Sequence, residues 1–449
     1  MKRFAILRRV AVLACLILLE ASCGNTFRPV VIIVPTTPPD PKGTHAAFLI
    51  ANNGPFNPGA AMQIDVSGDT NVGVAAVGIE PNFALVQPPG NRVIVSNGGN
   101  SAVSGTDSVT IFNPSTFTSI GLPFTISLPS GSHPVFMAAA SSNGFYVANA
   151  GTSTVAAVSS ITNTVSTIIP LDPVFGANPF ALAQTPDSKK VYVISTGAAG
   201  SLGGITSITT VDNTVTNVIS GGAVDNPVAI AVRSDSQRAY VLNKGNGDLT
   251  VINTFDDSLI SNSISAGAGA DFMRYDSNLN RLYLANPVLN TVTVLNVAVD
   301  PPAVLATVPL SSIAGAANPI SVATLLDGTR FYVLSEQLGN TCPPGVAAPC
   351  VATQLTVFNA NDYSYRKTIA LPTVTEMPAC QSVRFRFSAV ASADSSRVYV
   401  GNCDAGAASI ARTSDDTFVL NLAAPSGVCT MVGCTVPPPQ SPVLVIAGS

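Results

Sequence analysis

The chain has 449 residues, of which 47% are hydrophobic and only 10% are charged, and it contains no tryptophan. This composition is too apolar for a disordered protein, and the chain is too long for a small scaffold held together by disulfides. The formal net charge of −4 offers no basic surface for a nucleic acid. With only two histidines, His45 and His133, there are few ways to build a histidine metal site or a Ser-His relay.

The first 22 residues have the pattern of an export signal. Residues 2–9 carry four basic side chains, and the nine residues of Ala11–Leu19 form an uncharged apolar run. This run is too short to span a bilayer, which takes about 20 residues. It fits the hydrophobic segment of a signal peptide instead. We therefore predict a signal peptide at residues 1–22.

The residues around Cys23 resemble a bacterial lipobox, in which a cysteine receives a diacylglyceryl group and becomes the new N-terminus. Ala21 and Ser22 are small, as this pattern requires, but Glu20 stands where an aliphatic residue is preferred. We predict lipidation of Cys23, with ordinary cleavage and free secretion as the alternative. Residues 23–43 include the proline-rich stretch PTTPPDPKG and predict an extended tether behind the lipid anchor.

The remaining residues, 44–449, repeat one strand pattern eight times, at spacings of 43 to 67 residues. In each copy a short apolar run is followed by a small residue and then Asn or Ser. Seven of the copies follow a tight turn rich in Asp, Ser, Gly and Asn. The β-branched content predicts strands, and no long helical period is visible. The eight runs are Leu49–Asn52, Ile94–Asn97, Tyr146–Asn149, Tyr192–Ser195, Tyr240–Asn243, Tyr283–Asn286, Tyr332–Ser335 and Tyr399–Asn402.

Each repeat predicts four antiparallel strands, which we call A to D in chain order. An apolar run that precedes each turn is strand A, the repeated run is strand B, and two shorter runs follow as strands C and D. Four-stranded units of this length, repeated along a chain, are typical of a β-propeller. A single sheet cannot bury both of its faces, so the stack of sheets must close into a ring.

The two ends of the chain indicate how the ring closes. The first repeat, from Phe48, has strands B, C and D but no clear strand A. The segment Ser441–Ala447 closely resembles the strand A at Asn226–Val232. We therefore predict an all-β propeller of eight four-stranded blades, in which the C-terminal strand completes the first blade. Seven blades is the alternative, if the first or the last repeat is degenerate.

Two of the B strands resemble a known repeat. Arg238–Asn243 (RAYVLN) and Arg397–Asn402 (RVYVGN) match the R-x-Y-V-x-N strand of the YVTN-type β-propeller repeat of bacterial and archaeal surface proteins. The segment Cys23–Pro29 is similar to the N-terminus of predicted bacterial lipoproteins with such repeats. The resemblance implies the propeller fold and export. It leaves the activity open, because this fold hosts unrelated functions.

An even number of cysteines follows the predicted lipid site, which in an exported chain suggests disulfides. Six thiols allow fifteen pairings. Cys380 is expected just before a strand A and Cys403 just after the adjacent strand B, so these two should be neighbours. The six cysteines are Cys342, Cys350, Cys380, Cys403, Cys429 and Cys434.

The other four cysteines fall into two shared loops. Cys342 and Cys350 lie in one B–C insertion, and Cys429 and Cys434 lie in the last D–A connection. All six are therefore expected on the face of the D–A and B–C loops. The spacing supports no metal site, because there is no Cys-x₂-Cys pair and no adjacent histidine.

Four positively charged or titratable residues are expected on or beside strands A, which line the channel of a propeller. His133 opens one strand A, Arg274 lies on another, and Arg384 and Arg386 alternate with phenylalanines on a third. Because charge is scarce in this chain, we predict that these four bind an anionic ligand at the channel mouth. The alternative is that they pair with nearby carboxylates or water.

The function that these features favour is an exported, lipid-anchored propeller that acts as a non-catalytic binding or scaffold module at the cell envelope. We expect a monomer that is attached to the membrane by its lipid and binds a protein or a glycan. No cofactor, metal, nucleic acid or catalytic residue is assigned. The alternative is an enzyme similar to the lactonase-like propellers, which would hydrolyse a small anionic or sugar-derived substrate with His133 and either Arg274 or Arg386.

Overall fold

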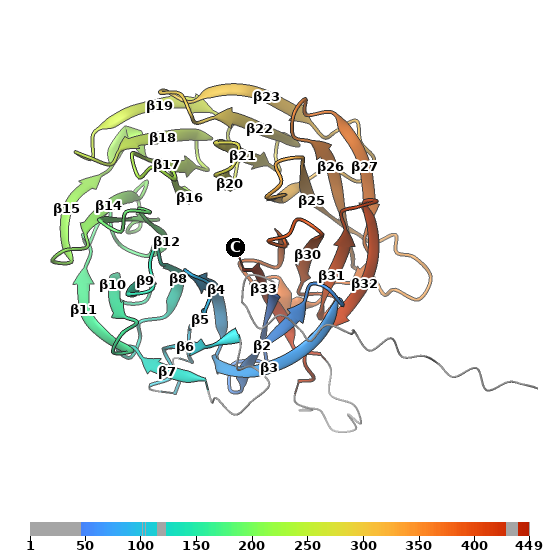
Figure 1. The fold of residues 1–449 in the computed structure, drawn as a ribbon, viewed down its shortest axis with the longest axis horizontal. Coiled ribbons are helices and arrows are strands. Elements are labelled where there is room, and N and C mark those ends of the chain that lie inside the picture. The colour runs from blue at the N-terminus through green and yellow to red at the C-terminus, as the bar shows by residue number, and fades with distance from the viewer. Residues whose placement is uncertain (1–45, 101, 104, 115–122, 428–438, 449) are drawn as a thin grey trace, which may run out of the picture. The chain divides into compact units, whose positions relative to one another are not determined.

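The computed structural model describes residues 46–100, 102–103, 105–114, 123–427 and 439–448. The predictions for the signal peptide, Cys23 and the tether lie outside these residues, and so do those for Cys429 and Cys434. The described residues form eight antiparallel sheets, which we number as blades 1 to 8 (Figure 1). In each blade the strands are given below from the innermost, A, to the outermost, D.

Blade 1 contains β33 (Ser441–Ala447), β1 (Ala46–Asn52), β2 (Pro58–Asp65) and β3 (Thr70–Ile79). Blade 2 contains β4 (Pro81–Gln87), β5 (Arg92–Asn97), β6 (Ser108–Phe112) and β7 (Phe124–Ser127). Blade 3 contains β8 (Pro134–Ala138), β9 (Gly144–Asn149), β10 (Thr154–Ser159) and β11 (Thr164–Pro170). Blade 4 contains β12 (Pro179–Gln184), β13 (Lys190–Ser195), β14 (Gly204–Thr209) and β15 (Thr214–Ile219).

Blade 5 contains β16 (Pro227–Val232), β17 (Arg238–Asn243), β18 (Asp248–Asn253) and β19 (Leu259–Ser265). Blade 6 contains β20 (Phe272–Asp276), β21 (Arg281–Asn286), β22 (Thr291–Asn296) and β23 (Ala303–Pro309). Blade 7 contains β24 (Pro319–Thr324), β25 (Arg330–Gly339), β26 (Cys350–Asn359) and β27 (Tyr365–Ala370), with β28 (Val374–Thr375) also paired to β26. Blade 8 contains β29 (Phe387–Ala391), β30 (Arg397–Asn402), β31 (Ala407–Arg412) and β32 (Thr417–Ala423). Two short 3₁₀ helices, η3 (Gly221–Ala223) and η4 (Pro378–Cys380), precede β16 and β29.

The innermost strands contact one another in an unbroken cycle around the channel. The order is β33, β4, β8, β12, β16, β20, β24, β29 and back to β33 (Figure 1). The eight-bladed prediction is therefore confirmed, and the seven-bladed alternative is wrong. Among the described residues we find no helix with the length and hydrophobicity that a bilayer crossing requires.

Blade 1 joins the two ends of the chain, as predicted. Strand β33 pairs antiparallel with β1, with Leu49 opposite Val445 and Ala47 opposite Ala447. The far edge of β1 pairs with β2 in turn. The sheet that begins near the head of the chain is thus completed by its tail, and no apolar blade face is left without a neighbour.

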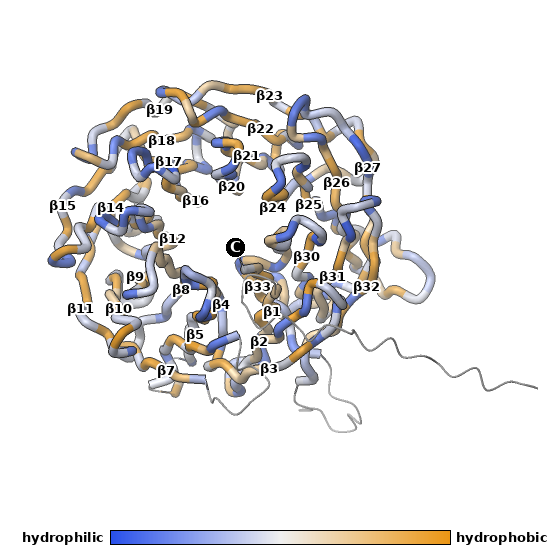
Figure 2. Tube along the Cα trace, in the orientation of Figure 1, coloured by the Kyte–Doolittle hydropathy of each residue, from blue (hydrophilic) through white to orange (hydrophobic). Residues whose placement is uncertain are grey.

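The hydrophobic core lies between the blades. On β21, Tyr283 packs with Phe331 and Phe358 of blade 7, whereas the adjacent Leu282 packs with Tyr240 of blade 5. Successive residues of a B strand therefore face opposite neighbours, and both faces are buried. A strand buried on both faces is expected to be a continuous apolar run rather than an alternating one. Figure 2 shows such hydrophobic stretches along the strands of every blade, separated by hydrophilic turns.

The first and third residues of the B strand join each of blades 2 to 8 to the blade that follows it. In blade 7 the Arg330 guanidinium lies 2.7 Å from Asp416 Oδ1, and the Tyr332 hydroxyl donates to the same oxygen at 2.6 Å. Asp416 belongs to the C–D turn of blade 8, and its side chain is 1% exposed. We call this contact, from the start of a B strand to the C–D turn of the following blade, the interblade latch.

Variants of the latch recur around the ring. They all join the first or third residue of a B strand to a C–D turn one blade further on. The pairs are Arg92–Asn163, Tyr146–Asn213, Lys190–Asp257, Tyr192–Asp257, Arg238–Asp300, Arg281–Ala360, Arg330–Asp416, Tyr332–Asp416 and Arg397–Asp69. The last pair joins blade 8 to blade 1, so the latch also reinforces the closure of the ring.

Candidate functional site at the channel mouth

Five of the innermost strands begin with the same local device, a residue of positive φ followed by proline. The proline is the first residue of the strand, where its missing N–H does not interrupt the sheet. Proline also disfavours the right-handed helical region for the residue before it. These residues carry their side chains at the channel mouth where the A strands begin, which we call the upper mouth. They are Glu80 (φ 52°), His133 (44°), Asn178 (52°), Asn226 (54°) and Asn318 (58°).

His133 is one of these turn residues and has structural contacts. Its N–H donates to Asp107 Oδ1 at 2.7 Å, and its Nδ1 lies 3.1 Å from the carbonyl oxygen of Gly98. Because a carbonyl oxygen only accepts, Nδ1 carries the proton in this contact and Nε2 is left as an acceptor. Asn178 holds the equivalent position in blade 4, where its amide donates to Gly197 O at 3.0 Å. Both residues thus contact a glycine carbonyl, but His133 reaches across to blade 2 while Asn178 bonds within its own blade.

Arg386 lies at the upper mouth, but not on a strand as predicted. Strand β29 starts one residue later, at Phe387. The Arg386 guanidinium binds Asp404 with two hydrogen bonds, of 2.7 and 2.9 Å, and Glu376 with one of 3.2 Å. Burial alone would lower the pKa of Arg386, but the bonds and charges of Asp404 and Glu376 raise it above its ordinary value. The pairing alternative therefore describes Arg386 better than free ligand binding.

A third carboxylate, Glu336, lies near this pair. Its Oε1 accepts a hydrogen bond from the Asn318 amide at 3.3 Å, while its Oε2 is buried without a hydrogen-bond partner. Burial raises the pKa of Glu336, Arg386 lowers it, and the charges of Asp404 and Glu376 raise it further, so that the net shift is upward. Within the described ranges, no group of three or more His, Cys, Asp or Glu side chains is arranged to hold a metal ion.

A disulfide reinforces the same region. Cys380 and Cys403 are bonded, with their Cα atoms 5.7 Å apart, which confirms the predicted pair. Cys342 and Cys350 are also bonded, across the insertion between β25 and β26. Both disulfides lie on the face of the D–A and B–C loops. Structural disulfides persist in oxidising compartments, so these two indicate a protein that works outside the cytosol.

The segment between Cys380 and β29 reaches across the channel. Arg384, which also precedes the strand instead of lying on it, donates to the carbonyl oxygen of Phe180 at 2.6 Å. Phe180 belongs to β12 of blade 4, which is four steps around the ring from blade 8 in either direction. The Arg384 guanidinium carbon lies 3.5 Å from the Phe180 ring centre and 4.9 Å from that of Phe385.

The aromatic residues beside Arg384 form a cluster that narrows the channel. Phe83 of blade 2 stacks on Phe136 of blade 3 with ring centres 3.9 Å apart, and its ring centre is 5.9 Å from that of Phe385. Burial among these rings lowers the pKa of Arg384 to about 9, which still leaves it charged at neutral pH. We call residues 381–386 the crossing segment. No local sequence pattern predicted that this segment crosses the channel.

Arg274 differs from the other three candidates. It lies in the middle of β20, the innermost strand of blade 6, with its side chain exposed. No hydrogen bond or ion pair joins its guanidinium to another residue in the described part of the chain. The protein around the channel displaces part of the water of this exposed side chain, which lowers the pKa of Arg274, and Asp276 partly opposes this shift. The flanking strands β16 (PVAIAV) and β24 (PISVAT) carry no charge, so Arg274 is an unpaired cation beside uncharged channel walls.

No family model matches the chain, and no curated protein matches it. Among solved structures, the dihydro-heme d1 dehydrogenase NirN in complex with DHE superposes with a TM-score of 0.61 at 9% identity, over 92% of this chain and 77% of that one. Apo AztD from Citrobacter koseri superposes with a TM-score of 0.59 at 9% identity, over 90% of this chain and 98% of that one. At such identities the likeness concerns the fold alone. The chain is an eight-bladed β-propeller.

Proposed function

We propose that this protein is an exported, lipid-anchored β-propeller that acts as a non-catalytic binding module at the cell envelope and binds an anionic group in its channel. The single observation that carries the proposal is Arg274, a cation of the channel without a polar partner among the described residues. The protein around the Arg274 guanidinium displaces part of its water, and the uncharged strands beside it offer no anion in return, so its charge is held at a cost in free energy. An anionic ligand would relieve this cost, and Arg384 would add a second positive charge at the upper mouth.

Export and anchoring are supported by separate features. The basic and apolar N-terminal residues have the pattern of a signal peptide, and Cys23 follows two small residues. The two disulfides on one face fit an oxidising compartment. We therefore propose that the mature protein is a monomer at the envelope, attached to a membrane through a lipid on Cys23. The intact mass of the mature protein tests this directly, because it reports the lipid and the disulfides together.

The contacts of His133 and Arg386 favour binding over the lactonase-like alternative. Both residues are engaged, His133 with a backbone carbonyl and Arg386 with two carboxylates. They belong to blades 3 and 8, and no contact in the described ranges brings them together. Screening lactones with the wild type and with His133→Ala tests the alternative. Hydrolysis that disappears in the variant would support an enzyme instead of a binding module.

Calorimetric titration with phosphate, citrate and succinate tests the channel site. The variant is Arg274→Gln, and the matched control is Arg412→Gln, which removes an exposed arginine of an outer ion pair. A hydrogen bond to a charged group contributes about 1.5–3 kcal/mol, so we expect a loss of roughly tenfold to a hundredfold in Arg274→Gln alone. Equal affinities in the two variants would refute the channel site. Recovery of a protein or glycan from envelope extracts by the immobilised wild type would identify a partner.

A further inference from the structure

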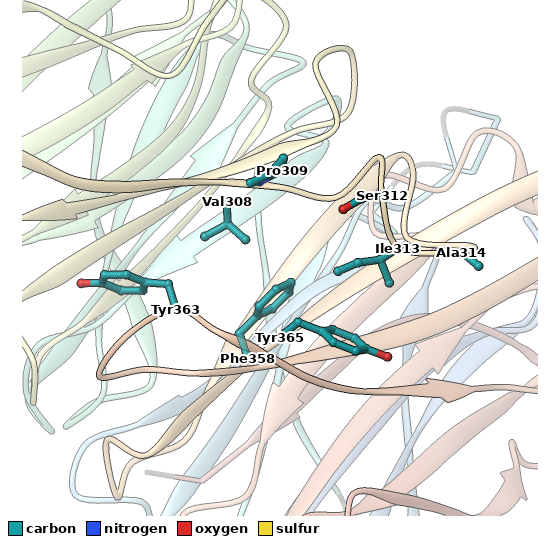
Figure 3. Close-up of a pocket in the computed structure, with 8 residues that line it drawn as sticks. All are labelled: Val308, Pro309, Ser312, Ile313, Ala314, Phe358, Tyr363 and Tyr365. Atoms are coloured by element: carbon teal, nitrogen blue, oxygen red, sulfur yellow. The ribbon is translucent and has the colours of Figure 1, made fainter.

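A cavity lies on the outer rim, between blades 6 and 7, away from the channel (Figure 3). Its volume is about 520 Å³, which is within the range of small-molecule sites. Val308 and Pro309 at the end of β23 and residues 312–314 form one wall. Phe358 and the two tyrosines Tyr363 and Tyr365, from the C–D hairpin of blade 7, form the other. We call this cavity the rim pocket.

Tyr363 departs from the repeat at a position where tyrosine is unfavourable. Its φ is 60°, in the left-handed region that Asn, Asp and Gly tolerate and bulky residues avoid. Five other blades place Asp or Asn at this point of the C–D turn, so the turn itself does not require an aromatic residue. Strained backbone positions of this kind gather at functional sites. The corresponding residues are Asp69 (φ 52°), Asn163 (53°), Asn213 (57°), Asp257 (60°) and Asp416 (53°).

The interblade latch at this junction is altered, and the altered contact holds the aromatic ring of Tyr363 in place. At three other junctions a basic residue of the preceding blade pairs with a carboxylate at this turn position, as Arg330 does with Asp416. Here the guanidinium carbon of Arg281 lies over the Tyr363 ring, 5.3 Å from its centre, and Arg281 donates to Ala360 O. The ring is therefore oriented before any ligand arrives, which reduces the entropy lost on binding.

The second tyrosine is also positioned, yet open to solvent. Tyr365 is 51% exposed, and its ring meets Phe358 edge to face with centres 6.3 Å apart. Its hydroxyl is 3.2 Å from Thr368 Oγ1. Tyrosine presents an apolar ring together with a polar tip, a combination enriched at binding surfaces. The two tyrosines belong to the same wall of the rim pocket and lie on either side of Phe358, with their rings directed to opposite sides (Figure 3).

The lining of the rim pocket indicates the chemistry of its ligand. None of the eight lining residues is charged, and the polar side-chain groups are the hydroxyls of Ser312, Tyr363 and Tyr365. Apolar faces bordered by hydroxyls suit a compact ring with apolar C–H faces and a rim of hydroxyls. We propose that the rim pocket binds a sugar ring of a neutral glycan, stacked on its tyrosines. This site is separate from the channel, and the proposal goes beyond the anion binding proposed there.

Saturation-transfer NMR with maltotriose, cellotriose and chitotriose tests the rim pocket on the full mature chain. Tyr363→Asp restores the residue of the repeat and offers Arg281 an ion pair, so the fold is expected to be retained. Tyr365→Ser removes the second ring at an exposed position. The matched control is Phe255→Ser, which removes an 89% exposed aromatic ring from the C–D turn of blade 5. Thermal unfolding of each variant reports whether it is folded.

We expect saturable transfer to the ring protons of at least one trisaccharide in the wild type and in Phe255→Ser. Both tyrosine variants should weaken this binding at least tenfold while remaining folded. The absence of saturable transfer from the wild type to all three sugars would overturn the proposal, and so would unchanged binding in folded Tyr363→Asp. Arg274→Gln should bind the sugar normally, so failure of the channel site and failure of the rim pocket are distinguishable.

Discussion

Replacing Asp416 with asparagine tests the interblade latch. Asparagine keeps the shape of the side chain and tolerates the positive φ of 53° at this turn. It removes the charge that Arg330 and Arg366 bind, while its remaining Oδ1 can still accept the hydrogen bond of Tyr332. The Arg330 side chain is only 15% exposed, so the variant leaves a largely buried cation without its anion. Breaking a buried pair in this way costs about 3–5 kcal/mol, and we expect about 3 kcal/mol.

The unfolding entropy converts this loss of unfolding free energy into a shift of Tm. At about 2.1 cal/mol/K per residue, a propeller of roughly 400 residues has an unfolding entropy of about 0.8 kcal/mol/K, so Tm should fall by about 4 °C. Differential scanning calorimetry measures the shift.

The neighbouring variant Asp415→Asn is the control for this measurement. Asp415 pairs with Arg412 at the surface, where both side chains are nearly half exposed. The loss of this ion pair should leave Tm unchanged. Equal shifts in the two variants would refute the argument that burial makes the latch important.

Three further predictions concern the upper mouth and the closure. Cys380→Ser should lower the free energy of unfolding by about 3 kcal/mol, because the disulfide to Cys403 closes a loop with a sequence separation of 23. Urea unfolding with and without reductant measures this free energy. Reductant should lower it through this bond in the wild type but not in the variant. The raised pKa of Glu336 means that its ionised form is less favourable in the folded chain, so wild-type stability falls as pH rises through that pKa. The Tm of Glu336→Gln should therefore equal that of the wild type at about pH 4 and exceed it at about pH 8. A constant difference in Tm across that range would contradict the raised pKa of Glu336. Ending the chain at Gln440 removes β33, exposes the core of blade 1, and should abolish soluble expression; a soluble, cooperatively folding product would show that closure is dispensable.

The repeat alone predicted most of the fold, because its signals are local. Apolar runs, turn residues and spacing along the chain define strands A to D, and the unmatched run Ser441–Ala447 predicted the closing strand that the structure shows as β33. The Cys380–Cys403 pair was also predictable, because adjacent antiparallel strands place known positions side by side.

An asparagine that ends a B strand can stabilise the turn that follows it. Asn286 Oδ1 accepts hydrogen bonds from the backbone N–H groups of Val288 and Leu289, as expected for a turn residue. Asn286 does not have a positive φ; at the upper mouth that conformation belongs to the residues before proline, such as Asn178 and Asn318.

The candidate site was decided by tertiary structure. Arg384 finds its acceptor, Phe180 O, 204 residues away in the chain, and Arg386 finds Asp404 through a loop that the strand pattern does not describe. The sequence by itself determined which residues form strands, because backbone preference and alternation act over a few neighbours. Which cations are paired, and which, like Arg274, have no partner among the described residues, depends on side chains that only the closed ring brings together, and no spacing along the chain contains that information.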